Sequence, residues 1–126
     1  MLLVDDDEDA RAMYSEGLGL AGFAVTTASD GEEALSKAIN GRFDVIVLDV
    51  AMPKMDGISV IKTLRANSTT QSVPIVTLSA FSDNRTRAAV VEAGGDLALE
   101  KPCLPAELEA VVRILVQRGK RIRDRQ

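Results

Sequence analysis

The sequence contains no histidine and no tryptophan, and Cys103 is its single cysteine. Without histidine, a Ser-His-Asp or Cys-His catalytic site and a histidine-ligated zinc centre are excluded, and the chain cannot itself carry phosphohistidine. With one cysteine, no disulfide can form within the chain, and we expect the thiol to fill space rather than to react. The chemistry available to this chain is therefore largely that of carboxylates.

Long apolar runs are also missing. No stretch approaches the roughly 20 apolar residues of a membrane-spanning helix, and acids begin at Asp5, where a signal peptide would be apolar. We therefore expect a cytoplasmic protein without membrane contact. Of the 126 residues, 46% are hydrophobic and 27% are charged, which is typical of one globular domain with its own core.

Acidic residues outnumber basic ones by 19 to 15, so the net charge is −4. Carboxylate oxygens favour a hard cation such as Mg²⁺ or Ca²⁺. Basic residues gather at the end of the chain, but no aromatic residues are interleaved with them, and we expect no direct nucleic-acid binding. We predict one domain over residues 1–118, followed by a basic tail or linker stub over residues 119–126.

The strongest strand signal is the apolar run Val45-Ile46-Val47-Leu48, which ends at Asp49. Four apolar residues in succession predict a strand buried on both faces, as in a parallel sheet. An acid at the carboxyl end of such a strand lies where open α/β sheets bind their ligands. Taken alone, an acid in this position is more often a turn residue or a helix cap.

Strand and helix patterns alternate along the whole chain. Further strands are predicted at residues 2–4, 22–27, 73–79 and 97–99. Helices are predicted from the acids after residue 4 to about Leu20, from Asp30 to Gly41, from Ile58 to about Asn67, from Ser82 to Ala93, and from Pro105 to about Gly119. This alternation predicts an α/β fold, a doubly wound five-stranded parallel sheet in the flavodoxin-like order 2-1-3-4-5 with helices on both faces.

In that strand order, polar side chains meet at one edge of the sheet. The residues in question are Asp5 and Asp6 after the first strand, Asp49 after the third, Ser79 after the fourth and Lys101 after the fifth. Carboxylates that lie close together repel one another and favour a divalent cation, and Mg²⁺ commonly uses one or two of them with water and phosphate oxygens. With an added ammonium and hydroxyl, the set contains what phosphoryl transfer to a carboxylate needs.

Several short segments around these residues together match the pattern of a known family. They are Asp5-Asp6, Asp49-Val50-Ala51-Met52-Pro53 followed by Met55-Asp56-Gly57, Ser79-Ala80, and Lys101-Pro102. In order and spacing, over nearly the whole chain, they resemble the receiver domain of two-component response regulators. The resemblance implies a phosphorylation-dependent switch that takes a phosphoryl group from a histidine kinase or histidine phosphotransfer protein. It implies a downstream protein partner or effector domain, and no enzymatic activity beyond the domain's own phosphorylation and dephosphorylation.

The resemblance also assigns roles to individual residues. Asp49 would be the phosphoacceptor. Asp6 and Asp49 would bind Mg²⁺ together with the backbone carbonyl of Ala51, and Asp5 would contribute through water. Lys101 would pair with the phosphoryl oxygens, and Ser79 would move toward them as the switch. The peptide bond between Lys101 and Pro102 is expected to be cis.

One position departs from the family pattern, and two other functions stay open. Receivers usually have an aromatic residue three positions before the lysine, whereas this chain has Ala98, so the route of the signal to the far surface is in question. We expect Phe81 or a partner side chain to fill the space. Ala98 is the one argument for a pseudo-receiver that is never phosphorylated. A phosphohydrolase with an aspartyl nucleophile is the other alternative, although the chain lacks a cap domain or long loop to form a substrate pocket.

Overall fold

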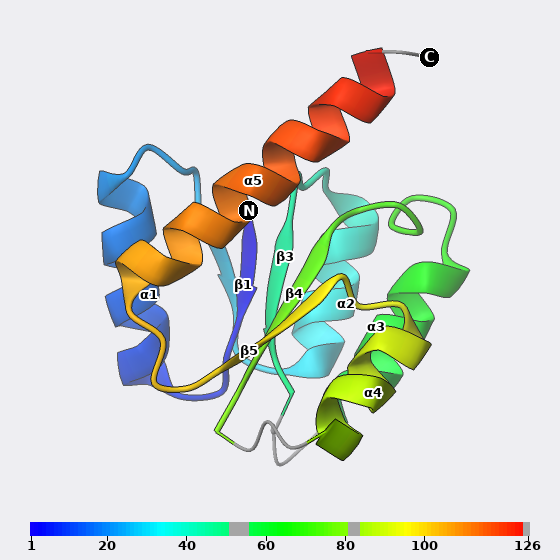
Figure 1. Ribbon diagram of the computed structural model, residues 1–126, viewed down its shortest axis with the longest axis horizontal. Helices are drawn as coiled ribbons and strands as arrows, with labels where there is room; N and C mark the ends of the chain where they lie inside the picture. The colour runs from blue at the N-terminus through cyan, green and yellow to red at the C-terminus, as the bar shows by residue number, and fades with distance from the viewer. Residues whose placement is uncertain (51–55, 81–83, 125–126) are drawn as a thin grey trace.

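The computed structural model of this protein describes residues 1–50, 56–80 and 84–124, with side chains as far as residue 119. Five parallel strands form one sheet in the order β2-β1-β3-β4-β5, and helices lie on both of its faces (Figure 1). The predicted fold class and strand order are therefore confirmed. None of the described helices combines the length and apolar character needed to cross a bilayer.

Strands and helices alternate strictly along the chain. The strands are β1 (Leu2–Val4), β2 (Thr26–Ala28), β3 (Ile46–Asp49), β4 (Ile75–Ser79) and β5 (Leu97–Glu100). The helices are α1 (Glu8–Leu20), α2 (Gly31–Asn40), α3 (Gly57–Ala66), α4 (Asn84–Ala93) and α5 (Pro105–Asp124). Every predicted element is present, but two predicted boundaries, the start of the second strand and the end of the last helix, were wrong by four residues or more.

The second strand begins at Thr26 rather than at Gly22, because the residues before it complete the end of α1. Gly22 has a φ of 100°, and the amide of Phe23 donates a hydrogen bond to the carbonyl of Leu18. Such a left-handed glycine with a return hydrogen bond is a common helix ending. The last helix continues to Asp124, past its predicted end at Gly119, since an isolated glycine costs a helix only about 1 kcal/mol and does not force it to stop.

The core has two layers, one on each face of the sheet. Side chains of β1 alternate between them, so that Leu2 and Val4 pack toward α2, α3 and α4, whereas Leu3 packs toward α1 and α5. The central strand β3 is buried along its whole length, as its apolar run predicted. Cys103 is buried among the side chains of the α1 and α5 layer, in agreement with its expected role as core filler.

Core packing on β3 provides a test of stability. Leu48 is 0% exposed, whereas Leu20 at the end of α1 is 84% exposed. We expect Leu48→Ala to lower the free energy of unfolding by about 2–5 kcal/mol, because it removes buried apolar surface and leaves a cavity. Leu20→Ala, the matched control, should change it by no more than about 0.5 kcal/mol. Urea denaturation followed by circular dichroism would measure both, and equal effects would contradict the packing described here.

Candidate functional site

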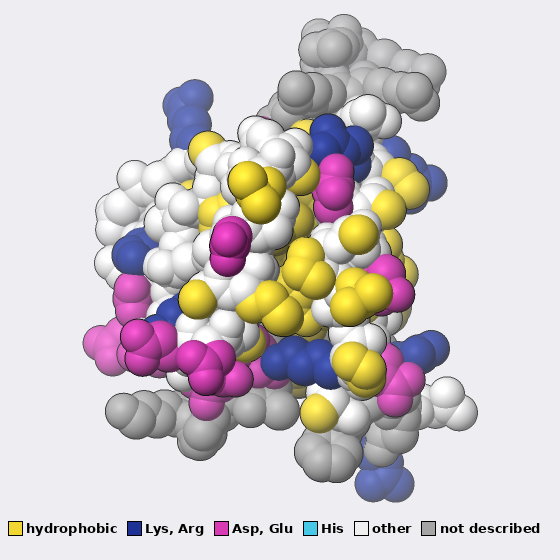
Figure 2. Space-filling model, turned by 90° about the vertical axis from the view of Figure 1, so that its left-hand side faces the viewer, with side chains coloured by type: hydrophobic (Ala, Val, Ile, Leu, Met, Phe, Trp, Pro, Cys, Tyr) yellow, Lys and Arg dark blue, Asp and Glu magenta, His cyan; other side chains and the backbone are white. Residues whose placement is uncertain are grey.

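Three carboxylates meet at the carboxyl ends of β1 and β3. Asp5 and Asp6 follow β1, Asp49 ends β3, and one carboxylate oxygen from each lies within 4.8 Å of the others. Asp5 and Asp49 are 1% and 7% exposed, whereas Asp6 is open to solvent. Figure 2, which views the molecule from the side of α1, shows acidic side chains gathered at the lower left. The cluster therefore combines buried acids with one acid at the surface.

Lys101, which follows β5, is the cation that partners these acids. Its Nζ lies 3.2 Å from Oδ2 of Asp5 and 3.3 Å from Oδ2 of Asp49. Burial by itself lowers the pKa of this ammonium, but the carboxylates of Asp49 and Asp5 outweigh burial and leave the pKa above its usual value of 10.5. The lysine is therefore charged at neutral pH, and among the described residues it is the one cation paired with these acids.

Short hydrogen bonds orient the buried acid Asp5. Its Oδ1 accepts a bond of 2.9 Å from the amide of Asp7, and its own amide donates to the carbonyl of Ala28 at 3.1 Å. Its backbone carbonyl accepts a bond of 2.8 Å from Nη1 of Arg11. Because Oδ2 pairs with Lys101, both carboxylate oxygens of Asp5 are engaged within the protein.

Ser79 ends β4, the strand next to β3, and its side chain is buried. In the β3–β4 register Asp49 is paired with Leu78, so Ser79 lies one residue further toward the site. The carbonyl of Ser79 accepts a hydrogen bond of 2.8 Å from the amide of Lys101. This hydrogen bond joins the carboxyl ends of β4 and β5 at the residues that carry the Ser79 hydroxyl and the Lys101 ammonium.

The start of α3 packs closely against the end of β3. Asp56 caps the helix by accepting a hydrogen bond from the amide of Ile58, as its predicted role in a turn and cap requires. The next residue, Gly57, comes so near Val50 that a Cβ on it would lie 2.7 Å from the Cα of Val50. No local pattern could reveal this contact, because tertiary packing brings the two residues together.

Residues 1–113 match the family of response regulator receiver domains. This chain belongs to that family. It is similar to the transcriptional regulatory protein PrrA of Mycobacterium tuberculosis, with 49% identity over 118 residues, which are 94% of this chain and 50% of that protein. This receiver domain thus spans about half the length of the curated relatives it matches.

Two solved structures show the same architecture in more distant relatives. The chemotaxis protein CheY4 of Vibrio cholerae has 38% identity and a TM-score of 0.87, over 90% of this chain and 95% of that chain. The receiver domain of the sensor histidine kinase PA1611 from Pseudomonas aeruginosa has 31% identity and a TM-score of 0.85, over 92% of this chain and 95% of that chain. That structure contains a magnesium ion coordinated in its active site cleft.

Membership in the family settles the general class of function. Response regulators are signalling proteins, not conventional enzymes. The boundary between a receiver domain at residues 1–118 and a tail at 119–126 stays a prediction. The same is true of the expected lack of nucleic-acid binding, since this chain corresponds to only half of relatives that are named transcriptional regulators.

The structure brings together most, but not all, of the residues predicted for the site. Asp5, Asp6, Asp49 and Lys101 form one cluster, Ser79 ends the neighbouring strand, and the bond between Lys101 and Pro102 is cis, as expected. Ala51 and Phe81 lie outside the described residues. Ala98, at the position of the missing aromatic, is half-buried and packs against the core layer of α2, α3 and α4.

The ion pairs of Lys101 generate a test. We expect Lys101→Met to lower the free energy of unfolding by about 1–3 kcal/mol, because it leaves the carboxylates of Asp5 and Asp49 without their cation. The side chain is 25% exposed, so the loss should be smaller than for a fully buried pair. Because the folded pKa of Lys101 is raised, this stabilisation is fully present below pH 10.5 and is lost as the pH rises further.

Urea denaturation at several pH values between 6 and 9 would measure the effect, with the exposed Lys62→Met on α3 as the matched control. The deficit of Lys101→Met should stay constant over this range. A deficit no larger than that of Lys62→Met would show that the pairs with the acids do not stabilise the fold.

Proposed function

We propose that Asp49 is the phosphoacceptor of this receiver domain and that its phosphorylation sets a signalling switch. The observation that carries the proposal is the position of its carboxylate, which lies 3.3 Å from the ammonium of Lys101 and within reach of two further acids. At 7% exposure, the Asp49 side chain is largely withdrawn from water. A carboxylate held beside a fixed cation is suited to accept a phosphoryl group, since the cation stabilises the charge on the phosphoryl oxygens.

In the transfer step, a carboxylate oxygen of Asp49 forms a bond to phosphorus as the bond between phosphorus and a donor nitrogen breaks. The donor nitrogen keeps the electron pair of the broken bond. Because these 126 residues contain no histidine, the phosphohistidine must lie outside them, in a histidine kinase or a histidine phosphotransfer protein. Lys101 pairs with the phosphoryl oxygens, and the hydroxyl of Ser79 donates a hydrogen bond to one of them.

The acid cluster fits Mg²⁺ in both ligand type and charge. Three carboxylates with oxygens inside 4.8 Å match the preference of this ion for hard oxygen ligands, and among the described residues one lysine pairs with two of them. Asp6 and Asp49 would hold the ion directly, together with the backbone carbonyl of Ala51. Asp5 would act through water, because its own oxygens are engaged by the Asp7 amide and Lys101. When bound, Mg²⁺ neutralises charge on the phosphoryl oxygens.

The output of the switch passes to a downstream protein partner or an effector domain. The greater length of the curated relatives supports the second of these, because each extends well beyond the part that matches this chain. A pseudo-receiver would have no need for a complete set of Asp5, Asp6, Asp49, Ser79 and Lys101. Phosphorylation of Asp49 would change the charge at the end of β3, and a partner that distinguishes the two states would read that change.

Phosphorylation from a small donor tests the assignment of Asp49. With acetyl phosphate and Mg²⁺, we expect intact mass spectrometry to show one added phosphoryl group on the native protein and none on Asp49→Asn. Asp44→Asn, which changes an exposed acid at the other end of the same strand, is the matched control and should be modified like the native protein.

The remaining outcomes separate the rival functions. Modification of Asp49→Asn at the native rate would overturn the assignment. Steady consumption of acetyl phosphate and of a simple phosphomonoester without an adduct would favour the phosphohydrolase. If the protein neither forms an adduct nor consumes the substrates, the result would favour the pseudo-receiver.

Metal binding gives an independent test of the acid cluster. We expect Asp6→Asn to weaken Mg²⁺ binding by at least about tenfold, because it removes an exposed ligand that no described protein cation partners. Isothermal titration calorimetry would measure the affinity, with the cap residue Asp7→Asn as the neighbouring control. An affinity unchanged in Asp6→Asn but lost in Asp7→Asn would move the metal away from the proposed ligands.

A further inference from the structure

The loop that carries Lys101 runs from β5 across to α1 before α5 begins (Figure 1). Two hydrogen bonds hold this loop around the lysine. The amide of Lys101 donates to the carbonyl of Ser79 at 2.8 Å, and the hydroxyl of Tyr14 on α1 donates to the carbonyl of Cys103 at 2.7 Å. The lysine backbone is thus fixed on one side by β4 and on the other by α1.

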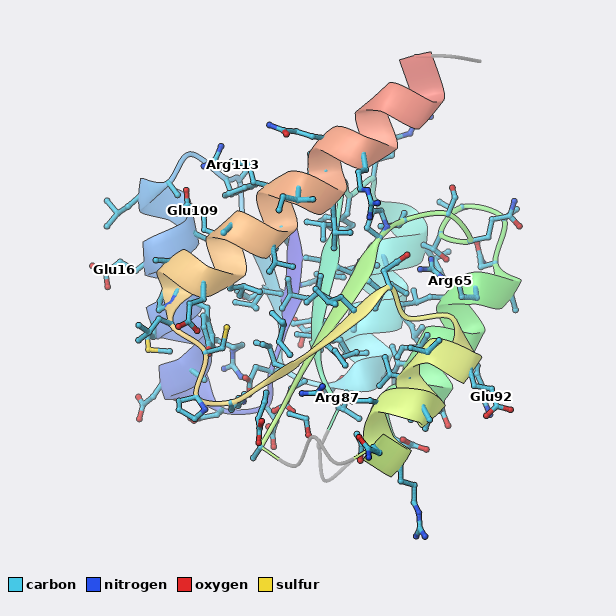
Figure 3. The ribbon with its side chains drawn as sticks, viewed as in Figure 1. Glu16, Arg65, Arg87, Glu92, Glu109 and Arg113 are labelled. Carbon is cyan, nitrogen blue, oxygen red and sulfur yellow. The ribbon has the colours of Figure 1, made fainter. Side chains whose placement is uncertain are left out.

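The hydrogen bond from Tyr14 lies inside the protein. Tyr14 is 3% exposed and packs in the same core layer as Leu18 and Leu108. Burial raises the pKa of its phenol, which keeps the hydroxyl protonated as a donor at neutral pH. On the same helix, Glu16 points outward, away from the sheet (Figure 3). Tyr14 therefore belongs to the inner face of α1.

A second side chain on α1 holds the other loop of the site. Arg11 stands one helical turn before Tyr14, a spacing that places two side chains on the same face of a helix. Its Nη1 donates to the backbone carbonyl of Asp5 at 2.8 Å. One face of α1 thus contacts both the acid loop, which carries Asp5 and Asp6, and the lysine loop, which carries Lys101.

We propose that Tyr14 is a positioning residue for Lys101, and that α1 sets the placement of the lysine relative to the acids by holding both loops. Tyr14 fixes the lysine loop through Cys103, and Arg11 fixes the acid loop through Asp5. The distance of 3.2 Å between Nζ of Lys101 and Oδ2 of Asp5 depends on both contacts. The inference rests on the proposed function, in which Lys101 acts on the phosphoryl group.

The variant Tyr14→Phe isolates this contact because it keeps the buried ring and removes only the hydroxyl. Thr70→Val is its matched control. Thr70 is also buried, and its hydroxyl also donates to a backbone carbonyl, that of Leu64, but it precedes β4 at the opposite edge of the sheet. Each variant removes one buried hydroxyl donor. Thr70→Val should lose no more stability than Tyr14→Phe, since the carbonyl of Leu64 still accepts a hydrogen bond from the amide of Asn67.

The two variants should differ in the rate of phosphorylation. At saturating Mg²⁺ and acetyl phosphate, we expect Tyr14→Phe to be phosphorylated about fivefold more slowly than the native protein, because a small displacement of a catalytic group has a large effect on rate. Thr70→Val should match the native rate. The Mg²⁺ affinity of Tyr14→Phe should stay within about twofold of native, because the ligands proposed for the ion are carried by other loops. If Tyr14 had a purely structural role, Tyr14→Phe would not slow phosphorylation while leaving the Mg²⁺ affinity unchanged.

A second measurement needs neither metal nor phosphoryl donor. In the metal-free protein, the NMR resonances of the Lys101 side chain and of the Asp5 and Asp49 carboxyl carbons report their ion pairs. We expect these resonances to shift in Tyr14→Phe and to keep their native positions in Thr70→Val. Arg11→Gln should also shift the resonance of Asp5, because it releases the acid loop.

The outcomes separate the inference from the proposed function. If the native protein takes up no phosphoryl group, the proposed function fails, and the NMR comparison still decides whether Tyr14 positions Lys101. If the native protein is phosphorylated and Tyr14→Phe matches Thr70→Val in both rate and resonances, Tyr14 does not position the lysine.

Discussion

The repulsion among three carboxylates is the constraint on which the site depends. Asp5 and Asp49 are buried, and burial makes an uncompensated negative charge expensive. Lys101 offsets part of this cost through two ion pairs, and within the described part of the chain it is the one cation paired with the three acids. Carboxylates that outnumber their paired cation favour a divalent cation, because such an ion supplies positive charge. The same clustering of carboxylates that costs stability therefore favours the binding of a cation.

Charged side chains are paired differently at the two ends of the parallel strands. At the edge opposite the acids, the guanidinium of Arg65 (Figure 3) donates to the carbonyls of Gly94 and Val73 and pairs with Asp96 at 2.9 Å. Asp96 in turn accepts a hydrogen bond from the amide of Ile75. These contacts join α3 to the starts of β4 and β5 by opposite charges and backbone carbonyls. At the carboxyl ends of the strands, by contrast, one described lysine pairs with two of the three clustered carboxylates.

Helix α1 connects the charge cluster to the rest of the core. Its inner face contributes Tyr14 and Leu18 to the layer shared with α5, and the same face reaches the two loops at the site. The close approach of Gly17 to Pro105, where a Cβ would lie 2.6 Å from the proline Cβ, fixes α1 against the start of α5. Packing and site geometry are therefore coupled through one helix, and the core determines how accurately the lysine faces the acids.

The sequence by itself determined the fold class and four members of the acid and lysine cluster, because these depend on local patterns. The strand order followed from the flavodoxin-like arrangement that such an alternation of strands and helices predicts. A buried apolar run ending at Asp49, and polar residues following successive strands, are visible without coordinates. The late start of β2 at Thr26 was decided by the hydrogen bonds that end α1, and the continuation of α5 past Gly119 by the tolerance of a helix for one glycine. The contacts of Arg11, Tyr14 and Gly57 came only from the tertiary structure. Each joins residues whose partners depend on how helices pack against the sheet, and no spacing along the chain encodes that distance.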